Sequence, residues 1–553
     1  MTVPAELVVR NAIVHTMVPG AAPAEAFAVS GGRLVAVGDD ETIGKLIGSE
    51  TQVVDLDGAP VVPGLVDAHN HHALAGRAEL FEVRFPSTAT VAEIVEAVRA
   101  WVAVHPDQEW VTGGTWGVGL LDALNDPAAL EALDAVSAGK KVLLTDDSHH
   151  NKWANTAAMA ASGIGIGTPD PEGGSVLRRA DGEPTGVLVE AAGALVQKAF
   201  AQATDADPEF WAACSARGVE LMNSRGITAF LDAGATEGVL RGLARLDEDH
   251  RLNGWAVSAM LVNDFVIGAE KLGAELFAVR EQTRTRHHRP DFAKVFLDGI
   301  PPTYTAAFLD PYAPSADHGQ CFRGATVMDH ETLENWLHRA DSEGLGVKVH
   351  CTGSAAVRQV LDAVEAVRAS GVSAIVHVAH GQYVADEDIP RFAPLDVVAE
   401  ISPPLWFPCD IVDVMRSILP ASWSTRVHPN RSLLDAGARL ACGSDWPVAP
   451  DPNPWPAIAG LATRANPYGT HPGTLWPEQA ITVREALDAY TASGAAALGL
   501  ADEIGTLLAG KSADFVVLDR DPFAVKPVEL AETEIVQTWF EGRPVFSQSS
   551  LDG

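Results

Sequence analysis

Two histidines separated by one residue, His69 and His71, follow an apolar run that breaks at Pro63 and Gly64. Side chains two positions apart on a strand point to the same side, so both imidazoles are expected to face one side together. At the carboxyl end of a barrel strand, that side usually carries the chemistry. Two converging imidazoles suit a divalent metal such as zinc. The alternative is a pair of exposed loop histidines.

Further ionisable residues end other apolar runs, where they are costly unless they have partners. His350 and His380 each end a predicted strand, and with the first pair they give four imidazoles around one rim. Asp445 ends the last strand, where a carboxylate can bind metal and act as a general base. An Asx turn before Pro447 is the alternative for Asp445. His377, three residues before His380, is predicted to face the opposite side and to be structural.

Lys294 lies within another apolar strand, in the sequence Ala-Lys-Val-Phe-Leu-Asp. An ammonium group cannot bind a cation, but a carboxylated lysine offers two oxygens and can bridge two metals. The alternative is an ion pair between Lys294 and a carboxylate such as Asp298. Lys348, which shares a strand face with His350 but lies deeper, is the main rival for the bridging position.

Eight apolar, β-branched runs, several of them separated by helical segments such as 329–343 and 355–370, predict a (β/α)8 barrel of the α/β class. They are 61–71, 227–231, 256–262, 293–297, 347–350, 374–380, 397–401 and 440–445. The count places 142–145 in an insertion that spans 80–220, after the first strand. Such an excursion often forms a lid or a specificity pocket.

Both ends of the chain contain short strands with tight turns, including a hairpin signal around 30–33. We expect residues 1–60 and 505–553 to form one β-sandwich domain, and residues 61–504 to form the barrel domain. Two separate β caps are the alternative.

The composition limits the possible partners and the compartment. Of 553 residues, 39 are basic and 73 acidic, which gives a net charge of −34 and argues against nucleic acid or an anionic membrane. Five scattered cysteines fit a reducing compartment without structural disulfides. No signal peptide and no apolar run of roughly 20 residues is visible. We therefore expect a cytoplasmic protein, with a homodimer as one option, that acts on a small-molecule substrate.

These motifs together resemble the metal-dependent amidohydrolase superfamily, and within it the YtcJ-like group that includes the N-substituted formamide deformylases. The similar phrases cover nearly the whole chain in the expected order. They are 63–71, 182–188, 294–299, 350–353, 380–390, 443–448 and 510–515.

The resemblance implies a TIM barrel with a small β-sandwich built from both termini, and one or two divalent metals, zinc first and manganese or iron next. It implies that His69 and His71 bind the more buried metal and that carboxylated Lys294 bridges. His350 and His380 would bind the second metal, and Asp445 would complete the first site and serve as the catalytic base.

The resemblance also indicates substrate contacts. His150, Trp153 and Asn155 match a tryptophan-asparagine element of the insertion, with His150 a candidate contact. Apart from the resemblance, the aromatic residues near the rim would line an apolar pocket, or alternatively would pack the insertion on the barrel; they are Trp116, Trp153, Trp406 and Trp446.

Two departures from related sequences stand out. The chain has Ser402-Pro403-Pro404 where related sequences often show Gln-Pro, and His72 adds a third histidine beside the pair.

The reaction expected from this set is hydrolysis of a C–N bond other than a peptide bond by metal-activated water. The bond would be an amide, an N-formyl or N-acyl amine, or a cyclic amide. A lactone or ester hydrolase could use the same site. Deamination is a further alternative, but Gly353 stands where superfamily deaminases commonly place a glutamate. From a different class, the chain could be a non-catalytic binding or regulatory protein.

Overall fold

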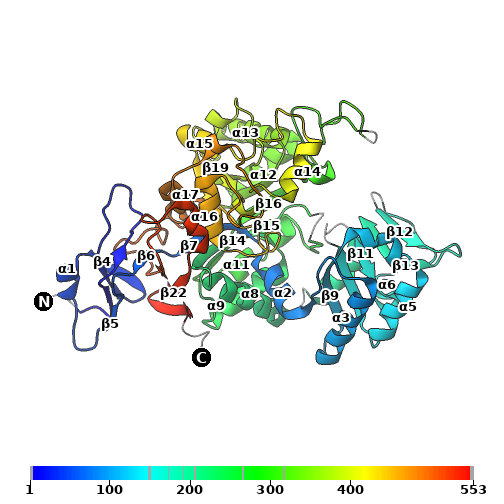
Figure 1. Cartoon of the computed structure of the whole chain (residues 1–553), viewed down its shortest axis with the longest axis horizontal. Coiled ribbons are helices and arrows are strands. Elements are labelled where there is room, and N and C mark those ends of the chain that lie inside the picture. Colours follow the sequence, from blue (N-terminus) through cyan, green and yellow to red (C-terminus); the bar gives the residue numbers. More distant parts are fainter. Residues whose placement is uncertain are drawn as a thin grey trace.

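Three bodies lie in a row along the long axis of the molecule (Figure 1). The computed structural model describes residues 4–146, 151–171, 174–190, 192–204, 207–264, 267–315, 318–405 and 407–548. Terminal β-sheets lie at one end, the barrel lies in the middle, and the insertion lies at the other end. In the described residues, every helix is too short or too polar to cross a bilayer.

The central body is a sheet of eight parallel strands, as predicted for the (β/α)8 fold. Its strands alternate with helices, and their buried, branched side chains explain why the apolar runs were recognisable. In sheet order they are β20 (Arg439–Cys442), β19 (Val397–Ile401), β18 (Val376–His380), β17 (Gly346–Cys351), β16 (His288–Phe296), β15 (Trp255–Leu261), β14 (Ile227–Ala235) and β7 (Leu65–Asn70).

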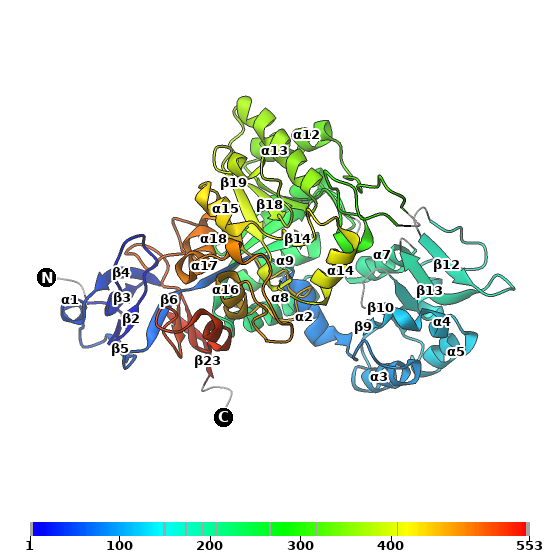
Figure 2. The ribbon, with the colours of Figure 1, turned by 45° about the horizontal axis from the view of Figure 1, so that its top comes forward.

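Helices cover the outside of this barrel (Figure 2). Their apolar faces pack on the strands; Val347 and Val349 of β17 and Val360 and Val364 of α13 belong to one buried cluster. The helices are α2 (His72–Phe81), α8 (Pro208–Asn223), α9 (Glu237–Glu248), α10 (Ala274–Phe277), α11 (Arg280–Thr283), α12 (His330–Ser342), α13 (Ser354–Ala369), α14 (Asp410–Ile418), α15 (Asn430–Asp435), α16 (Pro454–Thr463), α17 (Val483–Ala489) and α18 (Ala492–Ala497).

The first and last barrel strands meet at a seam that is closed just beyond the carboxyl end of β20. The backbone N–H of Asp445 donates to the carbonyl of His69 at 2.7 Å, and the N–H of His71 donates to the carbonyl of Trp446 at 2.8 Å. The hydroxyl of Ser444 donates to Asp67 at 2.6 Å. Barrel closure therefore brings the His-x-His segment against the Asp445 loop.

Both chain ends contribute to one small β body, which confirms the prediction and excludes two separate caps. One sheet has the order β2-β6-β21-β22-β23, and β21 pairs antiparallel with β6; the other has the order β4-β3-β1-β5. Phe27 and Phe515 meet between the sheets with ring centroids 4.9 Å apart. The strands are β1 (Leu7–Arg10), β2 (Ile13–Val14), β3 (Ala26–Ser30), β4 (Arg33–Gly38), β5 (Gln52–Asp55), β6 (Pro60–Pro63), β21 (Phe515–Leu518), β22 (Ile535–Phe540) and β23 (Arg543–Ser547), with α1 (Asp40–Gly44) beside them.

The apolar run 61–71, predicted as one strand, serves two sheets. Its first part is β6 in the terminal β body, and its second part is β7 in the barrel. The change of sheet occurs at Gly64, where a β-carbon would lie 2.0 Å from Oγ1 of Thr228. Only glycine fits this close approach, so the Pro-Gly break is a structural joint between the two bodies.

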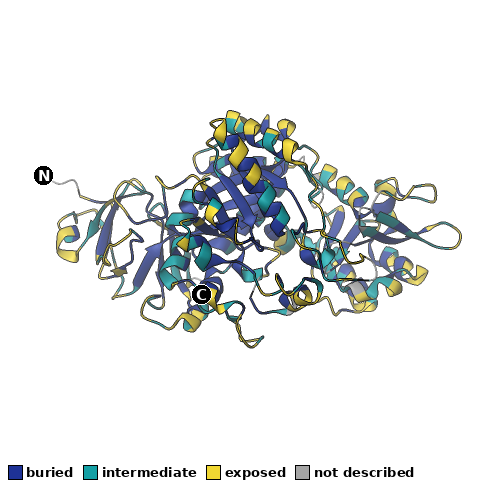
Figure 3. Ribbon diagram, turned by 90° about the horizontal axis from the view of Figure 1, so that it is seen from above, coloured by how far each residue is buried: buried dark blue, intermediate teal, exposed yellow. Residues whose placement is uncertain are grey.

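The insertion after the first barrel strand has its own sheet and core, and it stands apart from the barrel in Figure 3. Its sheet order is β12-β13-β11-β10-β9-β8, and the predicted strand 142–145 lies within β10. Trp116 and Trp153 are buried in its core. Its elements are β8 (Glu82–Val83), α3 (Val91–Val104), β9 (Trp110–Trp116), α4 (Leu121–Leu124), α5 (Pro127–Val136), β10 (Lys141–Asp146), β11 (Lys152–Ala154), α6 (Thr156–Ala161), β12 (Gly174–Arg178), β13 (Pro184–Glu190) and α7 (Gly193–Thr204).

Candidate metal centre

The structure brings His69, His71 and Asp445 into one cluster whose ligand atoms all lie within 4.8 Å of one another. Oδ1 of Asp445 lies 3.6 Å from Nε2 of His69 and 3.5 Å from Nε2 of His71. The two imidazoles approach the carboxylate from β7 and from the start of α2, across the barrel seam. The carboxylate thus lies beside both imidazoles at the rim.

The chemistry of this cluster fits a divalent cation. Nε2 of His69 is buried without a hydrogen-bond partner, and Nδ1 of His71 is too. Burial, with the charges of Lys294 and Lys348, lowers the pKa of His69 to about 3, so its imidazole is neutral. Burial opposes ionisation of Asp445, but the neighbouring histidines and Lys294 hold its pKa below the ordinary value. Neutral imidazoles with an ionised carboxylate are a common zinc ligand set.

His350 and His380 lie beside this cluster. The ring centroids of His380 and His69 are 4.5 Å apart, and those of His350 and His380 are 4.6 Å apart. Nδ1 of His380 lies 4.0 Å from Oδ2 of Asp445 and 3.2 Å from the hydroxyl of Ser402. Ser402, one of the departures from related sequences, is therefore used to hold a rim histidine.

The backbone at His380 explains why its ring reaches the rim. His380 has φ +68°, a left-handed conformation that is uncommon outside glycine. This turn brings its side chain to the interior, where His377 also points, as its hydrogen bond to Glu400 shows. The prediction that the two histidines face opposite sides is therefore wrong, because strand alternation fails at the left-handed residue.

Lys294 is buried in the barrel, with its ammonium nitrogen 4.9 Å from the centre of the Phe296 ring. Among the described residues it forms no ion pair. Asp298, the partner considered from the sequence, instead accepts backbone N–H groups from Ala307, Thr352 and Gly353. Burial and the charge of a neighbouring lysine lower the pKa of Lys294 to about 7.

Lys348, the rival to Lys294, is engaged in a buried ion pair with Glu400 of β19. Its ammonium group also donates to the carbonyl of Ala68 at 2.9 Å. Glu400 in turn accepts from Nδ1 of His69 at 2.5 Å and lies 2.6 Å from Nδ1 of His377. Although burial opposes it, these partners hold the pKa of Glu400 well below its usual range.

Sequence reasoning missed Glu400 and Asp67 as residues that support the cluster. Both are buried in apolar strands, and Asp67 accepts from the Ser444 N–H at 3.0 Å and from the His69 N–H at 3.1 Å. A carboxylate inside a run such as Val-Val-Ala-Glu-Ile was the available signal, because such a group needs buried partners. His72, left without a role, lies with Nδ1 2.8 Å from a carboxylate oxygen of Asp232 and outside the metal cluster.

The structure describes three of the five residues predicted to contact substrate, namely Trp153, Asn155 and Trp446. His150 and Trp406 lie outside the described residues. Trp153 is buried in the insertion core, and the amide of Asn155 binds backbone groups of the insertion, including the N–H of Ala158 at the start of α6. Both side chains are buried, where they pack and cap the insertion, and their contact with substrate stays a prediction. Trp446 is buried beside the cluster, and its carbonyl accepts from His71.

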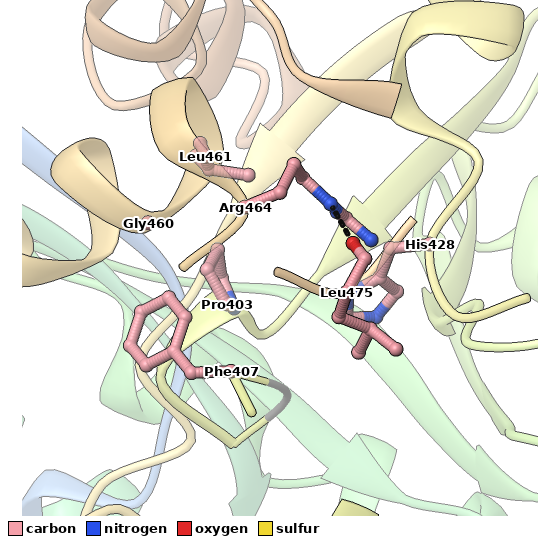
Figure 4. Close-up of a pocket in the computed structure, with 7 residues that line it drawn as sticks. All are labelled: Pro403, Phe407, His428, Gly460, Leu461, Arg464 and Leu475. Atoms are coloured by element: carbon pink, nitrogen blue, oxygen red, sulfur yellow. Dashed lines mark hydrogen bonds between the residues drawn. The ribbon is translucent and has the colours of Figure 1, made fainter. Parts of the chain in front are cut away.

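A small cavity of about 10 Å³ is lined by His428 and Arg464, among other residues (Figure 4). Arg464 donates to the carbonyl of Leu475 at 2.8 Å and to that of Val427 at 2.7 Å. His428, on the same wall, shares a 3.0 Å hydrogen bond with the carbonyl of His380. These contacts fix the loops that surround the histidine rim from behind.

The chain is similar in sequence and in fold to known hydrolases. The model of the amidohydrolase family matches residues 52–546. An N-substituted formamide deformylase from Arthrobacter pascens is 30% identical over 98% of both chains. YtcJ of Bacillus subtilis is 26% identical over 98% of this chain and 99% of its own. A crystal structure of an uncharacterised metal-dependent hydrolase from Pyrococcus horikoshii superposes with a TM-score of 0.75 at 21% identity, covering 94% of this chain and 99% of the other.

The chain belongs to the amidohydrolase family. This membership confirms the resemblance to the YtcJ-like group and the prediction of an amidohydrolase enzyme.

Proposed function

We propose that the enzyme hydrolyses a non-peptide C–N bond of a small molecule, with an N-formyl or N-acyl amine as the preferred substrate class. The observation that carries the proposal is the unpartnered, neutral Nε2 of His69 beside the carboxylate of Asp445. The relative from Arthrobacter pascens, named for deformylation of N-substituted formamides, supports this choice of bond. Cyclic amides are a further group to test.

His69, His71 and Asp445 would hold a divalent metal, for which we propose zinc, with manganese or iron as alternatives. When bound, such a metal supplies Lewis-acid chemistry, lowering the pKa of water towards about 7 and polarising the carbonyl oxygen. Asp445 accepts the proton of the attacking water. Asp445 then delivers this proton to the nitrogen as the C–N bond breaks, which releases an amine and a carboxylic acid.

Lys294, His350 and His380 would serve a second metal at the same rim. Lys294 suits carboxylation, because burial lowers the pKa of its amine to about 7 and a substantial fraction of it is then an uncharged nucleophile at neutral pH. Addition of this amine to carbon dioxide forms a carbamate and releases one proton. The carbamate oxygens would then be available, with His350 and His380, as ligands of the second metal.

Deamination, the main alternative reaction, is disfavoured by the backbone at Gly353. A β-carbon there would lie 2.1 Å from the carbonyl oxygen of Ala307. The glutamate that superfamily deaminases commonly place at this position therefore cannot be accommodated without moving the loop. Ester and lactone hydrolysis use the same attack and are separated from amide hydrolysis by assay.

The experiment is a screen of N-formyl and N-acyl amines, cyclic imides, lactones and aminated heterocycles with protein loaded with zinc, manganese or iron. We expect release of amine from the acyl amines, together with metal bound in stoichiometric amount. Turnover of lactones alone, or of aminated rings alone, would refute the proposed bond class. Metal-free protein that binds a ligand without turnover would favour a binding protein.

A further inference from the structure

Three strands of the barrel interior contribute charged or imidazole side chains to a single carboxylate, Glu400. This residue is fully buried, and its Oε1 accepts from Nδ1 of His69 at 2.5 Å. Its Oε2 contacts the ammonium group of Lys348 from β17 and lies 2.6 Å from Nδ1 of His377 of β18. The other ring nitrogen of His377 lies 2.9 Å from the carbonyl of Ala497.

The contact between Glu400 and His69 decides which nitrogen of His69 is available. A carboxylate beside Nδ1 places the proton on that nitrogen and leaves the lone pair on Nε2. Nε2 is the atom that lies 3.6 Å from Asp445 and has no hydrogen-bond partner. The hydrogen bond also fixes the plane of the ring, because the carboxylate is itself held by two further partners.

Lys348 has a separate effect on the same group. An ionised carboxylate at the centre of a barrel is very unfavourable unless a cation accompanies it. The ammonium group of Lys348 is bound on one side by Glu400 and on another by the Ala68 carbonyl, one residue before His69. Lys348 therefore neutralises the charge of Glu400 and also binds the backbone carbonyl next to His69.

We propose that Glu400, Lys348 and His377 form a positioning unit beneath the metal centre, which holds His69 with its proton on Nδ1 and its lone pair toward the metal. This inference rests on the proposed metal-binding role of His69. Glu400 and Lys348 act through His69 and touch neither substrate nor reacting atoms. The unit explains why a buried ion pair is kept where apolar side chains would fill the same space.

A double substitution separates positioning from stability. In Lys348→Met with Glu400→Leu, both charges are replaced by apolar side chains of similar volume, a change that often leaves stability unchanged or higher. Here, however, we expect a folded protein with an unfolding midpoint somewhat below that of the wild type, because His69, His377 and the Ala68 carbonyl lose their buried partners. We expect its zinc affinity, measured by competition with a chromophoric chelator, to fall by about 10- to 100-fold. A purely structural pair would lower the unfolding midpoint and leave the zinc affinity of the folded protein unchanged.

The matched control is Asp247→Asn, which removes a carboxylate 2.7 Å from Nδ1 of His287, away from the cluster. We expect this variant to lose stability and to keep its zinc affinity. If the double variant does not fold, the single variant Glu400→Gln replaces it in the same measurement. A loss of zinc affinity smaller than about tenfold in the folded variant overturns the proposal.

The zinc affinities of the variants can be interpreted without the substrate assay. If the wild type binds zinc but hydrolyses no screened C–N bond, the proposed function is refuted. The difference in zinc affinity between the wild type and the double variant still tests the positioning unit. Active wild type with unchanged zinc affinity in the variant would refute the positioning unit alone.

Discussion

Asp445 is joined to His69 through both its backbone and its side chain. Its N–H donates to the carbonyl of His69 at 2.7 Å, and its Oδ1 lies 3.6 Å from Nε2 of the same histidine. The first contact closes the barrel seam, and the second belongs to the candidate metal site. The contacts that close the barrel therefore also bring the residues of this candidate site together.

This double link makes Asp445→Asn a clean test, because the amide has the shape of the carboxylate and leaves the backbone bond intact. We expect turnover to fall by at least about 100-fold, since the proton acceptor is lost. The circular dichroism spectrum and unfolding midpoint should stay close to those of the wild type. Asp451→Asn, in an exposed pair with Arg225, is the control. Unchanged turnover in Asp445→Asn would exclude its role as the base.

Lys294→Ala tests carboxylation of the lysine. We expect loss of the second metal and of most activity, because the carbamate oxygens are removed. Added acetate or propionate should restore part of both, since a small carboxylate can occupy the vacated space and supply equivalent oxygens. The native mass of the wild type should exceed that of the unmodified chain by one carbon dioxide. Full activity in Lys294→Ala without any added acid would contradict the prediction.

Local patterns were sufficient to predict the barrel, because each strand is a buried apolar run bounded by turns. The same holds for His69, His71 and Asp445, since the ends of parallel strands meet at one rim. Glu400 could not be assigned, because its partners His69 and Lys348 are distant in sequence and its role depends on where they meet.

One error has a specific physical cause. Strand alternation predicts opposite faces for His377 and His380, but the left-handed backbone of His380 returns its ring to the interior. Contact of the tryptophan-asparagine element with substrate stays a prediction. In the structure Asn155 caps α6, and its amide also donates to the carbonyl of Lys140 at 2.9 Å. A sequence match indicates that such residues matter without showing what they touch.

Asn155→Ala therefore should weaken the insertion rather than substrate binding. The change removes an N-cap and leaves buried backbone groups of Val142 and Lys140 without partners. We expect a loss of about 1–3 kcal/mol in the free energy of unfolding of the insertion. Hydrogen exchange should show faster exchange in β10 and α6. A raised KM with unchanged exchange would restore the substrate-contact hypothesis.

Gly64→Ala tests the joint between the terminal β body and the barrel. The added methyl group would lie 2.0 Å from Oγ1 of Thr228, so the strands must separate. We expect a loss of about 1–3 kcal/mol of stability from this overpacking. Thr228→Ala in the same chain should recover part of it by removing the hydroxyl. Gly44→Ala, at a position with no atom within 4 Å of the new β-carbon, should be neutral or slightly stabilising.

The pair of His287 and Asp247 predicts how stability depends on pH away from the site. Burial opposes the charged imidazole, but hydrogen bonds to Asp247 and Glu541 raise the pKa of His287 to about 9. The ordinary value is 6.5, so folding favours the protonated form. The resulting stabilisation is fully present below about pH 6.5 and is lost as the pH rises through about 9.

Asp247, the partner of His287, does not titrate in this pH range. Against burial, hydrogen bonds with His287 and its neighbours lower the pKa of Asp247 to about 2, so its contribution changes only in acid. We expect wild-type stability to fall by up to about 3 kcal/mol between pH 6.5 and 9.5, because one unit of pKa shift corresponds to about 1.4 kcal/mol. Asp247→Asn should flatten most of this slope while Glu541 keeps a part. Denaturant unfolding across the range measures it, and parallel slopes for the two proteins would show that the pair does not carry the pH dependence.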